Sequence, residues 1–154
     1  MTLTNKIKIE LEKLDNLVNK IKELLELIKT NNDTIYSEGL VSGLALYLEN
    51  FYGGIERIFS LIGKEIDGSI PSGESWHIQL LNRMLIDIPS VRCAVISQNT
   101  YEQINEFRGF RHVARNLYAY ELKLERIIDL GEKVEKCYDN FHSDIMNFTE
   151  TLII

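Results

Sequence analysis

Residues 5–30 read NKIKIELEKLDNLVNKIKELLELIKT, and this stretch decides the fold. Its apolar residues recur at alternating steps of four and three, at Ile7, Leu11, Leu14, Val18, Ile21, Leu25 and Ile28. Lys and Glu occupy most of the other positions, so the pattern predicts one long amphipathic helix with a continuous apolar stripe. Such a stripe is typical of a helical-bundle core, and one of this length can also extend into a dimer interface. The side-chain amides of Asn31 and Asn32 compete with the backbone and end the helix.

A second, mostly buried helix is predicted over Thr34–Glu65. Its apolar positions include Leu40, Leu44, Leu48, Phe51, Ile55, Ile58, Phe59 and Ile62. Four glycines weaken the helical propensity of this segment, at Gly39, Gly43, Gly53 and Gly54. We interpret them as points of close approach between helices rather than as kinks.

The remaining elements follow from turn residues, caps and apolar spacing. They are a loop at 67–75, a short helix at 75–87 that Pro89 ends, an apolar connector at 90–96, a helix from a Ser97 cap to about Tyr118, and a helix at 125–152 whose apolar positions again alternate near three and four. No linker or repeat divides the chain of 154 residues, so we expect a single domain over residues 1–154. The predicted fold class is all-α, a bundle of four long helices with an additional short helix.

Composition restricts the functional classes. A net charge of −6 argues against binding of nucleic acid by the whole surface, although it is compatible with a local basic groove. Cys93 and Cys137 form no C-x-x-C pair, which favours reduced thiols in a cytosolic protein. The N-terminus lacks the apolar core of a signal peptide, and no run of about 18 apolar residues occurs. We therefore expect a cytoplasmic protein with no membrane span.

The segment with the most information about function is 107–118, FRGFRHVARNLY, which holds three arginines and a histidine and no acidic residue. On a helix, five polar residues share one face, which we call the cationic face: Arg108, Arg111, His112, Arg115 and Asn116. The opposite face is apolar, with Phe107, Phe110, Ala114 and Leu117. Guanidinium groups bind phosphate, and an imidazole can transfer a proton near neutral pH. Tyr118 and Tyr120 could stack on bases, so the mixture is typical of a groove that binds or cleaves RNA.

Other chemistries have weaker signals. His77, His112 and His142 are not at metal-ligand spacing, so we expect ordinary surface or capping histidines in place of metal ligands. No Gly-rich phosphate loop or nucleophile elbow is present, and we expect no metal and no cofactor. The competing interpretation of the cationic face is structural, with its arginines paired to acids such as Glu102 or Glu106.

Residues 110–118, FRHVARNLY, resemble the motif helix of HEPN-domain proteins, specifically of the HepT-like branch. The resemblance places Arg111 at the family arginine, His112 at the neighbouring polar position and Tyr118 at the family tyrosine. Asn116 occupies the position of the family histidine. Two further stretches resemble the same branch, LYLENFYGGIERIF at 46–59 and IPSGESWHIQLL at 70–81, so the likeness covers about residues 40–130.

The resemblance implies a homodimer in which two motif helices line a shared cleft. It implies a metal-independent endoribonuclease that acts as the toxin of a toxin–antitoxin pair, with a nucleotidyltransferase encoded by the adjacent gene as antitoxin. In such pairs the nucleotidyltransferase can add AMP to the motif tyrosine, which corresponds to Tyr118.

The replacement of the family histidine by Asn116 leaves two interpretations open, because an amide has no titratable nitrogen. In the first, His112 has taken over proton transfer and Arg111 contacts the phosphate and stabilises the transition state. Arg108 and Arg115 then guide the RNA, and Asn116 supplies a supporting hydrogen bond. In the second, catalysis is lost and the helical subunit binds a nucleotidyltransferase or RNA without cleaving it. A third possibility is a structural dimer whose arginines pair with acids across the interface.

Overall fold

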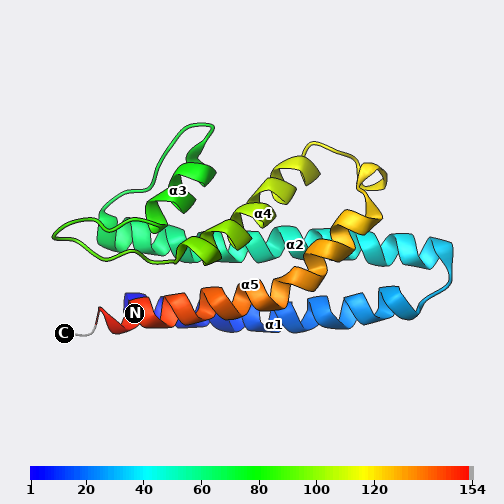
Figure 1. Ribbon diagram of the computed structural model, residues 1–154, viewed down its shortest axis with the longest axis horizontal. Coiled ribbons are helices and arrows are strands. Elements are labelled where there is room, and N and C mark those ends of the chain that lie inside the picture. The colour runs from blue at the N-terminus through cyan, green and yellow to red at the C-terminus, as the bar shows by residue number, and fades with distance from the viewer. Residues whose placement is uncertain (153–154) are drawn as a thin grey trace.

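The computed structural model describes residues 1–152, and this part of the chain is all-helical (Figure 1). Five α-helices follow one another along residues 1–152: α1 Leu3–Thr30, α2 Thr34–Ile62, α3 Trp76–Met84, α4 Gln98–Ala114 and α5 Leu124–Glu150. A π-helical turn at Gly63–Asp67 continues α2, and a short 3₁₀ turn at Ala119–Glu121 precedes α5. The predicted all-α bundle of four long helices and one short helix is therefore confirmed.

The apolar stripe of α1 is confirmed residue by residue. All seven predicted positions are buried: Ile7, Leu11, Leu14, Val18, Ile21, Leu25 and Ile28. At its start, the Thr2 hydroxyl accepts a hydrogen bond from the Asn5 backbone N–H at 3.2 Å. At its end, the Asn31 side chain accepts the N–H of Asp33 at 2.8 Å, and Asp33 in turn caps α2. Side-chain capping thus fixes the position of the α1–α2 corner.

Helix α2 is the centre of the bundle, since it packs against α1, α3, α4 and α5. Phe51 meets Phe107 of α4 edge to face with ring centroids 5.1 Å apart, and Phe59 meets Phe141 of α5 in the same way at 5.7 Å. The prediction of a mostly buried helix holds from Leu44 onward, whereas the first turn is exposed.

Close packing is confirmed at Gly54, where a Cβ atom would lie 2.6 Å from Cδ2 of Leu14. Helices α1 and α2 therefore approach each other so closely at Gly54 that an added side chain would displace that of Leu14. Gly39 is different, because a Cβ there would meet no atom within 4 Å. The interpretation of the α2 glycines as packing sites is wrong for Gly39.

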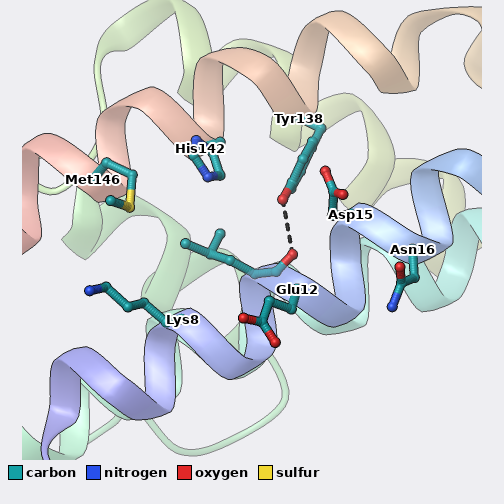
Figure 2. Close-up of a pocket in the computed structure, with 8 residues that line it drawn as sticks. Lys8, Glu12, Asp15, Asn16, Tyr138, His142 and Met146 are labelled. Carbon is teal, nitrogen blue, oxygen red and sulfur yellow. Dashed lines mark hydrogen bonds between the residues drawn. The ribbon is translucent and has the colours of Figure 1, made fainter.

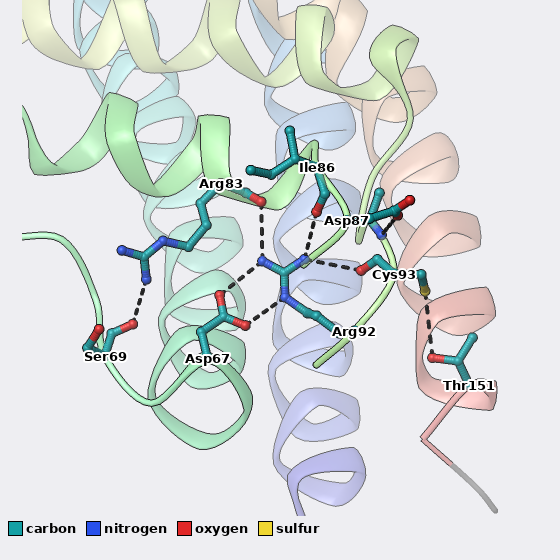
Figure 3. A network of polar contacts seen from close by, with 9 residues as sticks. Asp67, Ser69, Arg83, Ile86, Asp87, Arg92, Cys93 and Thr151 are labelled. Carbon is teal, nitrogen blue, oxygen red and sulfur yellow. Dashed lines mark hydrogen bonds and ion pairs between the residues drawn. The ribbon is translucent and has the colours of Figure 1, made fainter. Parts of the chain in front are cut away.

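Helix α3 ends at Met84, three residues before the predicted end at Asp87. The cause is the connector that follows it (Figure 3). The Met84 carbonyl accepts the backbone N–H groups of Val95 and Ile96, at 2.8 and 3.2 Å. Because the returning connector occupies this carbonyl, the helical hydrogen-bond pattern does not continue.

The side chain of Arg92 holds this connector in place, and its partners are drawn in Figure 3. Its guanidinium donates to both carboxylate oxygens of Asp67, at 2.7 and 2.9 Å. It also donates to the carbonyl oxygens of Arg83, Ile86 and Cys93, at 3.2, 3.0 and 3.1 Å. The Arg92 and Asp67 side chains are only 1% and 4% exposed. One buried ion pair therefore ties the end of α2 to the end of α3.

The remaining boundaries agree with the sequence at the start of α4 and along α5. Ser97 is the N-cap of α4 and accepts the Thr100 backbone N–H at 3.2 Å, as predicted. The apolar stripe of α5 is buried at Ile127, Leu130, Val134, Cys137, Phe141, Ile145 and Phe148. The end of α4 differs from the prediction, as described below.

We predict that Arg92→Ala lowers the free energy of unfolding by about 3–5 kcal/mol, because it leaves the Asp67 carboxylate buried without a partner. Urea unfolding followed by circular dichroism measures this. Arg83→Ala is the control, since its guanidinium donates only to the Ser69 carbonyl and its loss costs about 1 kcal/mol. Equal effects of the two substitutions would contradict the role given to Arg92.

We predict opposite effects of alanine at two glycines of the same helix. Gly54→Ala lowers the free energy of unfolding by about 1–3 kcal/mol, because the new methyl group clashes with Leu14. Gly39→Ala raises it by up to about 1 kcal/mol, because alanine favours the helix and open space surrounds this position. Thermal unfolding of the two variants separates these outcomes, and stabilisation by Gly54→Ala would contradict the α1–α2 packing.

Candidate functional site

Helix α4 carries the cationic face, and its apolar side fixes the orientation. Ile104, Phe107 and Phe110 are buried. On the other side, Arg108 and Arg111 are half-buried and His112 is exposed. The predicted division of the helix into an apolar and a cationic side is therefore present up to Ala114.

The cationic face does not continue along a helix to Tyr118, because α4 ends at Ala114. Arg115 is the C-cap residue, and Asn116 lies beyond it. The amide Nδ2 of Asn116 donates to the carbonyl oxygen of His112 at 2.8 Å, and its backbone N–H donates to Val113 at 3.1 Å. These contacts tighten the last turn and end the helix. The prediction of a helix to about Tyr118 was wrong, and Asn116 is a capping residue in the structure.

Tyr118 lies on the turn that follows α4. Its ring stacks on that of Tyr120, with centroids 5.9 Å apart and 9° between the planes. The two side chains are 73% and 85% exposed. The Tyr118 backbone N–H donates to the Glu121 carboxylate at 2.9 Å, which fixes the turn. The tyrosine is thus accessible beside the end of the cationic face.

The structural interpretation of the arginines is only weakly supported within residues 1–152. Among these residues, Arg108 and Arg111 contact no carboxylate, and Arg108 donates to the Asn105 side chain at 2.9 Å. Arg115 lies 3.8 Å from Glu49, and at that exposure the pair contributes little. The proposed partner Glu106 binds Lys133 of α5 at 3.0 Å instead.

A second polar centre lies next to the cationic face, and sequence reasoning missed it. Glu56 of α2 is 7% exposed and its Oε2 lies 2.6 Å from Nδ1 of His77 in α3. The buried Tyr52 hydroxyl lies beside the same carboxylate. Burial raises the pKa of Tyr52 well above its usual value, the Glu56 charge raises it further, and the charges of Arg108 and Arg111 partly oppose this. Groups from α2 and α3 therefore meet at Glu56, and the charges of two α4 arginines act on the same region.

One signal in the sequence could have revealed this centre. Glu56 follows Tyr52 by four residues and precedes Phe59 by three, which places it on the buried stripe of α2. A buried carboxylate needs a partner. His77, which was expected to be an ordinary surface or capping histidine, is that partner.

The largest hollow described lies elsewhere, between α1 and α5, and has a volume of about 590 Å³ (Figure 2). Its walls carry Lys8, Glu12, Asp15, Asn16, Tyr138, His142 and Met146. The Tyr138 hydroxyl donates to the Leu11 carbonyl at 2.9 Å across the groove, and burial raises the pKa of Tyr138 to about 12. None of the residues of the cationic face lines this groove.

Within residues 1–152, no group of three or more His, Cys, Asp or Glu side chains is arranged to hold a metal ion. Nor does any described helix combine the length and apolar character that crossing a bilayer requires.

The fold and the cationic helix define an all-α bundle of the HEPN-like class. A family model described as HepT-like protein matches residues 43–152, from α2 to the end of α5. The chain therefore belongs to the HepT-like family. No curated protein and no solved structure matches the chain.

We predict that Asn116→Ala loosens the last turn of α4, because the His112 carbonyl loses its side-chain donor. The expected loss of stability is about 0.5–1.5 kcal/mol. Amide hydrogen exchange at Arg115 and Asn116 measures the local opening. Asn99→Ala serves as the control, because Asn99 lies exposed in the first turn of α4 and makes no side-chain hydrogen bond to a described residue. Equal exchange in both variants would exclude the capping role.

Proposed function

We propose that this chain is the toxin component of a toxin–antitoxin pair and a metal-independent endoribonuclease. Membership of the HepT-like family supports the class of function. The observation that supports RNA cleavage is the pair Arg108 and Arg111. Both are half-buried on α4, and the exposed His112 follows Arg111 in the sequence. Within residues 1–152, neither guanidinium is neutralised by a carboxylate, so both are available to an anion such as an RNA phosphate.

Each residue of the cationic face has a role in this proposal. Arg111 contacts the scissile phosphate and stabilises the charge that develops on it. His112 transfers a proton during attack of the ribose 2′-hydroxyl on that phosphate. Arg108 and Arg115 guide the RNA backbone, and Asn116 supports the site from the end of α4. No metal or cofactor takes part.

The proposed assembly is a homodimer of single-domain chains, residues 1–154, in the cytoplasm. The cationic faces of the two copies line a shared RNA-binding cleft. The antitoxin is a nucleotidyltransferase from the adjacent gene, which transfers AMP from ATP to the Tyr118 hydroxyl and releases pyrophosphate. The exposed, stacked rings of Tyr118 and Tyr120 support this part, because the hydroxyl is accessible and the ring pair offers a surface for adenine. The added phosphate then competes with RNA for the arginines.

The second candidate is a helical subunit that binds a nucleotidyltransferase or RNA without cleaving it. The capping role of Asn116 favours it, since the residue at the family histidine position has no titratable nitrogen and its amide holds the His112 carbonyl. The two candidates differ in whether the isolated chain cleaves RNA.

We predict that the purified chain cleaves cellular RNA in EDTA, and that His112→Ala slows cleavage about 10²–10⁴-fold, as expected for loss of a proton-transferring group. Arg111→Ala slows it as well, and RNA gel electrophoresis measures both effects. His142→Ala is the matched control, because its imidazole lies in the α1–α5 groove.

Three outcomes decide between the candidates. Cleavage by the wild type that His112→Ala leaves unchanged would contradict the role of His112. A wild type that binds RNA and does not cleave it would favour the second candidate. Growth arrest on expression of the chain alone, relieved by Arg111→Ala, would support the toxin.

A further inference from the structure

Three helices bring polar groups together on one side of α2. Helices α3 and α4 run in opposite directions beside each other (Figure 1), and the Tyr101 hydroxyl of α4 donates to the side chain of Asn82 in α3. Because the two helices are antiparallel, the start of α3, which carries His77, lies toward the middle of α4. Arg108 lies in that part of α4. Glu56 of α2 lies beneath His77.

The Glu56–His77 contact fixes the orientation of the imidazole. The Glu56 carboxylate oxygen lies 2.6 Å from Nδ1 of His77. Nδ1 therefore carries a hydrogen and donates a hydrogen bond to Glu56. The other ring nitrogen, Nε2, makes no hydrogen bond to any residue among 1–152. The His77 side chain is 30% exposed, whereas that of Glu56 is 9% exposed. A buried carboxylate thus orients an imidazole whose second nitrogen is free for chemistry.

The surroundings restrict the ring further. The indole of Trp76 lies against the His77 ring with centroids 3.8 Å apart. The buried Tyr52 hydroxyl lies beside the Glu56 carboxylate. An orienting carboxylate, a packed ring and one unpartnered nitrogen are the arrangement that a positioned proton donor or acceptor requires.

We propose that His77 is a second catalytic residue of the RNA-cleaving site and that Glu56 is its positioning residue. This inference rests on the proposed function. It follows from the oriented imidazole at the start of α3 and from the packing of α3 against α4, the helix that carries the half-buried Arg108 and Arg111. The ligand is a phosphodiester of single-stranded RNA, held by the arginines with its ribose or leaving oxygen toward Nε2.

The reaction needs two proton transfers, which is the reason for a second imidazole. The 2′-oxygen attacks phosphorus and loses its proton to one imidazole. The bond from phosphorus to the 5′-oxygen breaks, and that oxygen takes a proton from the other imidazole. The products are a 2′,3′-cyclic phosphate and a 5′-hydroxyl, and no oxidant, reductant or metal is consumed. His112 supplies one imidazole and His77 supplies the other.

The charges that face His77 come from two helices besides its own. Glu56 faces it from α2 with the Tyr52 hydroxyl beside the carboxylate, and the charges of Arg108 and Arg111 on α4 act on Tyr52. Trp76 is the aromatic neighbour on α3 and carries no charge. A pH–rate profile therefore reports the imidazole within this set, and variants of the Glu56 carboxylate are needed to interpret it.

The test compares cleavage rates across pH for the wild type and four variants of the full chain. His77→Asn keeps a donor toward Glu56 and removes the titratable nitrogen, and we expect at least a 10²-fold loss together with loss of one limb of the pH–rate profile. Glu56→Gln shifts the pH midpoint of that limb, and Glu56→Asp leaves the midpoint closer to that of the wild type. His142→Asn is the matched control and leaves rate and profile unchanged. Circular dichroism melting confirms that each variant is folded.

A binding measurement separates this inference from the proposed function. The probe is a thymidine dinucleotide, which has the phosphodiester and no 2′-hydroxyl, titrated into the protein while the imidazole signals of His77 are followed by NMR. We expect a saturable shift in the wild type that Arg111→Ala abolishes.

The outcomes are distinct. Cleavage by the wild type with an unchanged rate and profile in His77→Asn overturns the role of His77 and leaves the proposed function standing. A wild type that cleaves no RNA overturns the proposed function and proton transfer by His77 with it. If the wild type cleaves no RNA, a saturable shift of the His77 signals with the dinucleotide still supports a phosphodiester-binding site at His77. The absence of any shift overturns that binding site too.

Discussion

The buried ion pair between Arg92 and Asp67 is the constraint on which the architecture around the site depends. A guanidinium removed from water is stable only when its donors are satisfied, and this one has both oxygens of Asp67 and three carbonyl oxygens. Its partners come from the end of α2, the end of α3 and the connector to α4. The ion pair therefore fixes the position of α3 relative to α2 together with the buried apolar residues of α3, Leu80, Leu81 and Met84. That position also places His77 over Glu56.

Helix α2 combines two functions because its buried stripe is not uniformly apolar. Gly54 admits α1 at close range, and Phe51 receives Phe107 of α4. Between these packing contacts, Tyr52 and Glu56 introduce polar groups into the same stripe. A carboxylate in this environment requires a compensating donor, and His77 provides it. The same helix thus supports the bundle core and the base of the proposed site.

The cationic face separates into two zones when the helix end is taken into account. Arg108 and Arg111 form the inner zone, where they are half-buried and their charges act on Tyr52. His112 and Arg115 are exposed at the outer zone, where Asn116 caps the helix. Charge in the inner zone is partly desolvated and so interacts more strongly with a phosphate than charge in the outer zone. In the proposed function, Arg111 of the inner zone is therefore well placed to contact the reacting phosphate, and Arg115 of the outer zone to guide the RNA strand.

The sequence by itself determined the helices and the faces they bury, because apolar periodicity and capping depend on residues within a few positions of one another. The stripe of α1, the Ser97 cap and the two-sided character of α4 were all predictable for this reason. Only the tertiary structure decided where α3 ends and which residue satisfies Glu56. Those features depend on Arg92 meeting Asp67 and on His77 meeting Glu56, contacts between residues that are 25 and 21 positions apart. No local pattern specifies such a meeting, since it arises from the packing of helices against one another. The end of α4 is an intermediate case. The sequence shows an asparagine at position 116, but it does not show whether this residue continues the helix or ends it.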